Sequence, residues 1–302
     1  MSTSRHGRIG TYLRGCAMGA ADIIPGVSGG TIALITGIYL RLLSAIGEVP
    51  GAAWQWLQER RWHAFWQRVD GGFLLLLMAG ILTSVFLLAN LITWLMAHQA
   101  VLLWSFFCGL ILAAIVHLAL EVQRWTAVAV MLLLCGAAVA WVITGMTPTQ
   151  LTPSLSVLFL GGAVAICAMI LPGISGSFIL LLLGLYGPVL QGVRDLDWVL
   201  LGVFAAGCLT GLLSFSRLVA AALRRFPSAT LALLTGFMAG ALPAVWPWKA
   251  PDSGDNLSPF VYAQLSGEPH QLSWALLLLL LGALMVLFLQ KGQAVRKGQT
   301  LG

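Results

Sequence analysis

The chain contains the same broken apolar element twice. Residues 25–39 read PGVSGGTIALITGIY and residues 172–186 read PGISGSFILLLLGLY, so that Pro25 pairs with Pro172, Ser28 with Ser175 and Tyr39 with Tyr186. Each copy places proline and glycine, which interrupt helices, in the middle of an apolar stretch. Such a duplication predicts two repeats, each beginning with a helical hairpin that is broken at its centre.

The composition places these repeats in a membrane. Of the 302 residues, 59% are hydrophobic and 9% are charged, whereas soluble domains average about 25% charged residues. The net charge of +6 would suggest nucleic acid as a partner of a soluble protein, but here the basic residues lie in loops, where they orient a membrane protein. We therefore expect no nucleic-acid partner. The five cysteines sit apart in apolar segments without metal-ligand spacing, so we expect no metal and no cofactor.

Hydropathy divides the chain into two repeats, 1–150 and 151–302. Each repeat begins with a broken hairpin and continues with three apolar segments that are long enough to cross a bilayer. The first repeat also carries an amphipathic, Trp-rich insertion that is predicted to lie in the membrane interface. The predicted order is hairpin 10–46, insertion 51–70 and segments 72–97, 101–120 and 126–146, then hairpin 155–191 and segments 197–223, 228–246 and 272–290.

The distribution of Lys and Arg predicts the topology, because basic loops lie on the cytoplasmic side. If each hairpin returns to the side it entered and every other segment crosses once, all basic residues except Arg194 and Lys249 lie inside, together with both termini. A hairpin that crossed once as a kinked span would place the basic region 60–68 outside. Three crossings per repeat make the repeats inverted. The sequence thus predicts an all-α integral membrane protein with two inverted-topology repeats, each a re-entrant hairpin plus three transmembrane helices.

The charge pattern does not distinguish a re-entrant hairpin from one that crosses the bilayer fully twice, although the short halves favour re-entrance. Inverted repeats with broken helices are typical of transporters that bind substrate near the midplane and expose it to each side in turn. The half-helix after each break presents backbone N–H groups, a positive dipole end and hydroxyl groups, which suit a phosphate or carboxylate. The candidate phosphate ligands are Ser28, Gly29, Gly30 and Thr31 in the first tip and Ser175, Gly176 and Ser177 in the second. Alternatively, each motif is a tight turn whose serine caps the next helix.

Asp22 precedes the first break within an apolar run, and its counterpart in the second repeat is Met169. A carboxylate inside a membrane is costly and marks a functional position by default. Asp22 could carry a coupling proton, because burial and a bound phosphate both favour the protonated form. It could equally hold the hairpin tip by a hydrogen bond.

Three arginines are candidates for guiding an anionic headgroup. Arg14 and Arg41 flank the first hairpin, and Arg217 lies about two turns inside the end of its segment. Each of them could instead be a snorkelling anchor at the membrane surface.

The segments MGAADIIPGVSGGTIALITGIY and LPGISGSFILLLLGLYGPVL closely resemble the bacterial polyprenyl-phosphate translocase family. The resemblance spans nearly the whole chain. It implies a flippase, not an enzyme, that returns undecaprenyl phosphate from the outer to the inner leaflet of the bacterial cytoplasmic membrane. The second motif has Ser177 and Phe178 where the first has Gly30 and Thr31, so the two tips need not contribute equally.

Other functions are compatible with the same residues. A membrane lipid pyrophosphatase would also place serine-rich loops in the membrane, but it needs a nucleophile with a base or metal-binding carboxylates, and neither tip has a nearby Glu or His. A channel or carrier for small anions would need only the tips. The sequence leaves open the energy source, the chain length of the lipid and the oligomeric state, including a homo-oligomer.

Overall fold

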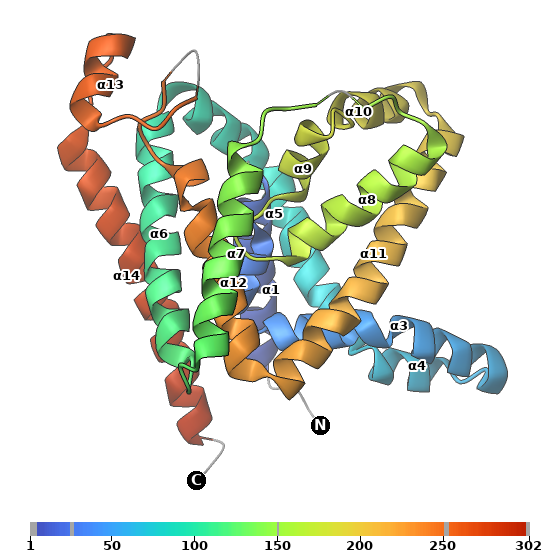
Figure 1. Ribbon diagram of the computed structural model, residues 1–302. Helices are drawn as coiled ribbons and strands as arrows, with labels where there is room; N and C mark the ends of the chain where they lie inside the picture. Colours follow the sequence, from blue (N-terminus) through green and yellow to red (C-terminus); the bar gives the residue numbers. More distant parts are fainter. Residues whose placement is uncertain (1–4, 25–26, 150, 251–253, 300–302) are drawn as a thin grey trace.

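A computed structural model describes residues 5–24, 27–149, 151–250 and 254–299. Pro25 and Gly26 of the first motif lie outside the described residues. Within the described chain the protein is all-helical except for one isolated antiparallel bridge between Lys249 and Asn256. Among the described residues, six helices are long and apolar enough to cross a membrane, or up to eight if each bent helix pair counts as one span. The expected all-α membrane fold is therefore confirmed (Figure 1).

The first half contains seven helices. The hairpin consists of α1 (Arg5–Asp22) and the short α2 (Gly29–Ile35), and three long helices follow later in the chain. Two further helices, α3 and α4, lie between the hairpin and these three long helices. The predicted interfacial segment 51–70 corresponds to the end of α3 together with α4, so it is not a single helix. These five helices are α3 (Tyr39–Glu59), α4 (Trp62–Arg68), α5 (Gly71–His98), α6 (Ala100–Glu121) and α7 (Ala127–Gly145).

The second half repeats this order without the insertion. Its hairpin consists of α8 (Leu155–Ile170) and α9 (Gly176–Leu182), and the elements that follow are α10 (Tyr186–Asp195), α11 (Trp198–Arg225), α12 (Pro227–Ala241), η1 (Leu242–Val245), α13 (Pro259–Ser266) and α14 (Leu272–Gln299). In both hairpins the returning helix is only seven residues long, and the chain then bends by 119° into α3 and by 104° into α10. Gly37 and Gly184 adopt left-handed φ values of 69° and 70° in these bends, a conformation that costs glycine little.

Helix pairs at equivalent positions pack in the same way. α1 packs on α5 as α8 packs on α11, and α7 packs on α12 as α14 packs on α6. Glycines bring these backbones together: a Cβ atom at Gly109 of α6 would overlap the carbonyl of Leu279 in α14, and one at Gly236 of α12 would overlap the carbonyl of Leu133 in α7. Small residues that allow close backbone approach are the usual basis of helix association in membranes. Each type of helix contact therefore occurs twice, at equivalent positions of the two halves.

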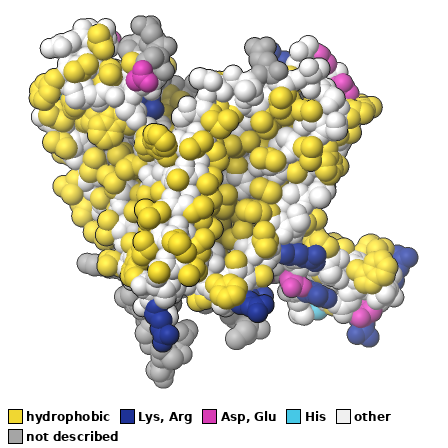
Figure 2. All heavy atoms as spheres, in the orientation of Figure 1, with side chains coloured by type: hydrophobic (Ala, Val, Ile, Leu, Met, Phe, Trp, Pro, Cys, Tyr) yellow, Lys and Arg dark blue, Asp and Glu magenta, His cyan; other side chains and the backbone are white. Residues whose placement is uncertain are grey.

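Charge and exposure distinguish the ends of the molecule from its middle. Figure 2 shows hydrophobic side chains over the middle, with Lys and Arg gathered at one end. Large apolar side chains such as Phe86 and Phe288 are 80% and 78% exposed, which fits contact with lipid rather than water. In Figure 1, α1 begins and α14 ends at this basic end, where α3 and α4 also lie, while α10 lies at the opposite end.

Candidate functional site: the two hairpin tips

The first tip is closed by its own side chains. The Oδ1 atom of Asp22 accepts a hydrogen bond of 2.6 Å from the N–H of Gly29, and the Oγ atom of Ser28 accepts one of 3.1 Å from the N–H of Gly30. A carboxylate at the N-terminus of a helix is stabilised by the helix dipole. Two of the N–H groups expected to bind phosphate are thus occupied, and the Asp22 carboxylate lies where an anionic ligand was expected.

The two tips contact each other directly. The hydroxyl of Ser28 donates to the carbonyl of Met169 at 3.0 Å, and the N–H of Gly173 donates to the hydroxyl of Thr31 at 3.0 Å. Ser28 and Thr31 are 1% and 0% exposed, so the contact is sealed from both sides. Residues more than 140 positions apart in the chain are joined here because the start of α2 lies against the end of α8 and the break that follows it.

Tyr39 makes the third bond between the hairpins, and the sequence analysis gave it no role. Its buried hydroxyl donates to the carbonyl of Ile170 at 3.0 Å. Ile170 ends α8, so its carbonyl has no partner within the helix and needs one elsewhere. The sequence feature that could have indicated a role for Tyr39 is its duplication as Tyr186. The two copies differ, however, since Tyr39 is 2% exposed and Tyr186 is 42% exposed.

The second tip is arranged differently. The hydroxyls of Ser175 and Ser177 lie 2.8 Å apart, and neither caps the backbone of α9. Ser175 is buried, and Gly176 packs against the carbonyl of Ala165 in α8. The difference between the motifs noted in the sequence therefore corresponds to a real asymmetry, since only the first tip has its helix N-terminus occupied by a carboxylate.

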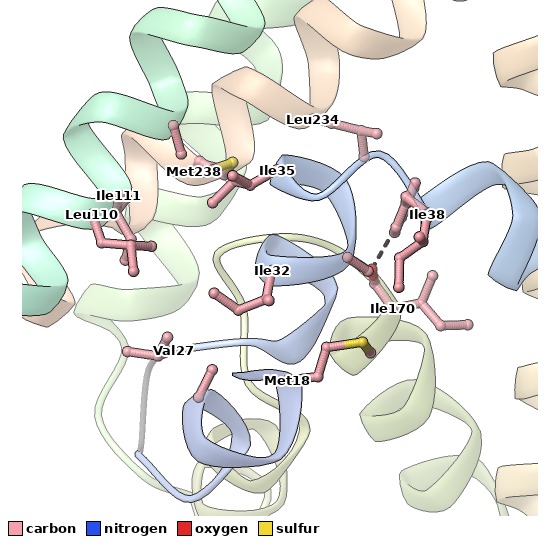
Figure 3. Packing of buried hydrophobic residues seen from close by; sticks show 14 of the residues in the cluster. Met18, Val27, Ile32, Ile35, Ile38, Leu110, Ile111, Ile170, Leu234 and Met238 are labelled. Carbon is pink, nitrogen blue, oxygen red and sulfur yellow. Dashed lines mark hydrogen bonds between the residues drawn. The ribbon is translucent and has the colours of Figure 1, made fainter. Parts of the chain in front are cut away.

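An apolar cluster surrounds the first tip. Figure 3 shows Ile32, Ile35 and Ile38 packed among side chains of α6, α8 and α12, including Leu110, Ile170, Leu234 and Met238. Such packing fixes the position of α2 without polar groups beyond those at the tip. Exposure of the tip to either side would require rearrangement of these contacts.

The three candidate arginines lie away from the tip contacts. The Nε atom of Arg41 forms a salt bridge of 2.6 Å with Asp70, and its guanidinium lies 4.2 Å from the centre of the Phe73 ring. The Nε atom of Arg217 donates to the carbonyl of Gly47 at 2.5 Å. Arg14 is half-buried in α1, two turns before Asp22. These positions flank the hairpins and do not form part of the sealed contact.

Thr31→Val is expected to destabilise the contact between the tips. Valine has nearly the same shape but leaves the N–H of Gly173 without its acceptor, which costs about 1 kcal/mol in a membrane protein. Thermal unfolding in detergent should show a lower Tm for this variant. Thr31→Ser keeps the hydroxyl, so its Tm should be closer to that of the unmodified protein. An equal loss of Tm in both variants would show that the methyl group, not the hydrogen bond, matters.

Comparison with known sequences finds relatives that are named as lipid transporters. The sequence model of the VCA0040-like family, described as undecaprenyl phosphate translocase-like, matches residues 18–257. A protein of Vibrio cholerae serotype O1 named polyprenyl-phosphate transporter is 44% identical over 296 residues, covering 94% of this chain and 96% of that protein. A Staphylococcus aureus protein of the same name is 34% identical over 254 residues, covering 78% and 85%.

Comparison with solved structures finds no match to the chain. The matched region contains both motifs and five of the six candidate spans. With this coverage and these identities, the chain belongs to the undecaprenyl phosphate translocase-like family.

Proposed function

We propose that the protein is a flippase that moves polyprenyl phosphate, undecaprenyl phosphate above all, from the outer to the inner leaflet of the bacterial cytoplasmic membrane. The observation that carries this proposal is the direct contact of the two duplicated tips through Ser28 and Thr31. The names of the two relatives, polyprenyl-phosphate transporter, support the substrate. No covalent bond is formed or broken in this process.

The tips provide the groups that an anion needs at membrane depth. Bringing an ion into hydrocarbon costs tens of kcal/mol on an idealised estimate. Phosphate would replace the bonds that now join the tips, taking hydrogen bonds from Ser28, Gly29, Gly30 and Thr31 on one side and from Ser175, Gly176 and Ser177 on the other. The isoprenoid tail would remain in the bilayer while the headgroup crosses.

The closed tips support alternating access. In the present conformation the contact excludes solvent on both sides, so a substrate can bind only after the hairpins part. We propose that the two halves are inverted repeats that rock against each other, and the matching interfaces of α1–α5 with α8–α11 support this relation. If the hairpins opened first toward one side of the membrane and then toward the other, the phosphate bound between them would pass the apolar cluster.

We further propose that Asp22 exchanges a proton during this cycle. Its carboxylate holds the Gly29 N–H, a position that phosphate would compete for, and two anions at one helix N-terminus repel each other. Protonation of Asp22 would weaken its hold on the Gly29 N–H, which the substrate could then take. Arg14, Arg41 and Arg217 would guide the headgroup at the cytoplasmic face, with both termini on that side, as the basic end of the molecule suggests (Figure 2).

Purified protein in liposomes tests the function. Labelled polyprenyl phosphate should change leaflets faster than in protein-free liposomes, and neither free phosphate nor chloride should compete strongly. Translocation at the rate of empty liposomes would contradict the proposal. Strong competition by small anions would instead indicate an anion carrier, and release of inorganic phosphate from undecaprenyl pyrophosphate would indicate a lipid pyrophosphatase.

A further inference from the structure

The amphipathic insertion places Arg68 on α3 near Arg217, one of the arginines proposed above to guide the headgroup. Figure 2 shows Lys and Arg side chains gathered where α3, α4 and the end of α11 meet. Two of them come from α11, Arg217 and Arg224, and one, Arg68, comes from α4. All three reach the same helix, α3, whose second half belongs to the insertion.

The face of α3 that receives them is made of small residues. Ser44, Gly47 and Gly51 follow one another at helical spacing and therefore share one face. The Nη2 atom of Arg224 donates to the Ser44 hydroxyl at 2.6 Å, and the Nε atom of Arg217 donates to the Gly47 carbonyl at 2.5 Å. The absence of side chains at the two glycines lets the guanidinium groups lie directly on the helix.

Two guanidinium groups converge on Gly51. A Cβ atom built at this glycine would lie 3.1 Å from Nη2 of Arg68 and 4.0 Å from Nη2 of Arg217. Both guanidinium groups thus face the same small area of α3, which concentrates positive charge there and favours an anion. Arg68 is partly compensated, since its Nε atom pairs with Glu48 at 2.9 Å and its Nη1 atom donates to Gln55 at 2.9 Å.

The charges of the cluster are not balanced within the described residues. Glu48 is the single carboxylate in salt-bridge contact with these three arginines, which leaves two positive charges. A phosphate monoester carries about −1.5 to −2 charges at neutral pH, whereas a phosphodiester carries one. Arginine pairs also match the geometry of a phosphate group better than lysine does.

The position of the cluster relates it to the tips. Helix α3 starts at Tyr39, which bonds to the second hairpin, and Gly47 lies about 12 Å further along the same helix. Exposed aromatic side chains of the insertion, Trp54 at 66% and Trp62 at 58%, place α3 and α4 at the headgroup level of a membrane. A lipid that leaves the tips toward the basic end would thus meet the cluster in the same leaflet.

We propose that Arg68, Arg217 and Arg224 with the small-residue face of α3 form a second phosphate site, which receives the monoester headgroup of the translocated lipid at the inner leaflet. This inference rests on the proposed function and gives the insertion a role in it. The site is separate from the tips and acts after the headgroup has crossed. It would hold the headgroup on the basic side until the lipid leaves the protein.

Photo-crosslinking with farnesyl phosphate that carries a diazirine beside the phosphate tests this site. In the unmodified protein, peptide mapping should find label on residues 44–55 as well as at the tips. Arg217→Gln should reduce the label on 44–55 by about tenfold, the effect of losing one charge-assisted contact, and by much more than it reduces the label at the tips. Arg225→Gln is the matched control: Arg225 directly follows Arg224, but its guanidinium lies 5.5 Å from the centre of the Phe226 ring, so the change should alter neither label.

Competition separates the ligand classes. Phosphatidylglycerol, a diester, and inorganic phosphate, which lacks a tail, should each displace the label from 44–55 only at much higher concentration than unlabelled farnesyl phosphate. Displacement by phosphatidylglycerol at equal concentration would overturn the assignment to a monoester. Label confined to the tips would overturn the second site while leaving the transport proposal intact, and absence of label and of translocation together would contradict the transport proposal itself.

A second variant, which keeps all charges, serves as the control for loss of folding. Gly51→Ala adds one methyl group between the guanidinium groups, 3.1 Å from that of Arg68, and should also reduce the label on 44–55. A normal Tm with undiminished label in both Gly51→Ala and Arg217→Gln would show that these arginines only anchor α11 on α3.

Discussion

Asp22→Asn is expected to keep the hairpin folded and to abolish the dependence of lipid translocation on a proton gradient. Asparagine can still accept the hydrogen bond of the Gly29 N–H, but it can neither take up a proton nor carry a charge. If one proton moves with each lipid, an imposed gradient of one pH unit changes the leaflet ratio of unmodified protein by up to about tenfold. The variant should show the same ratio with and without the gradient.

Reconstituted vesicles with labelled polyprenyl phosphate and a set internal pH provide this measurement. Asp22→Ala is the companion variant, because it removes the hydrogen bond as well as the charge. It should lower the Tm in addition, by a loss of about 1–3 kcal/mol for the unpaired N–H. Gradient dependence that persists in Asp22→Asn would remove Asp22 from proton coupling and leave it the role of a cap that holds the tip.

Gly236→Leu is expected to prevent folding. A Cβ atom at Gly236 overlaps the backbone carbonyl of Leu133, so the leucine can be accommodated only if α12 and α7 separate. Overpacking against a backbone that cannot move costs more than about 4 kcal/mol. Size-exclusion chromatography in detergent should show little or no monodisperse protein.

The control for this variant is Gly202→Leu. Gly202 lies on the exposed side of α11, and no atom lies within 4 Å of a Cβ built there. This change should leave yield and Tm close to those of the unmodified protein. A folded Gly236→Leu protein with the same Tm as Gly202→Leu would mean that α7 and α12 are not packed as closely as described.

The membrane spans could be predicted from the sequence because hydropathy depends on composition alone. The predicted segment 72–97 corresponds to α5 at Gly71–His98, and 126–146 corresponds to α7 at Ala127–Gly145. The hairpins were predicted by their outer bounds, 10–46 and 155–191, and within them α2 and α9 are seven residues long. Their ends are set by the left-handed bends at Gly37 and Gly184, which hydropathy does not detect.

The helix pairing could not be read from the sequence. Gly109 and Gly236 occupy equivalent positions, but nothing in their local sequence shows that they face Leu279 and Leu133. Contacts between distant segments depend on how complete helix surfaces fit together. The same holds for Tyr39, whose acceptor is the carbonyl of Ile170 in the other hairpin.

The sequence by itself determined that a broken element occurs twice in a membrane chain and which hydroxyls, glycines and carboxylate stand at its breaks. The tertiary structure decided how those groups are used. Asp22 closes the first tip, Ser28 and Thr31 bond to the second hairpin, and Arg217 lies on α3 beside Arg68. The physical reason is that N–H groups at a break must find acceptors, and which acceptor lies within reach depends on helices that are far apart in the chain.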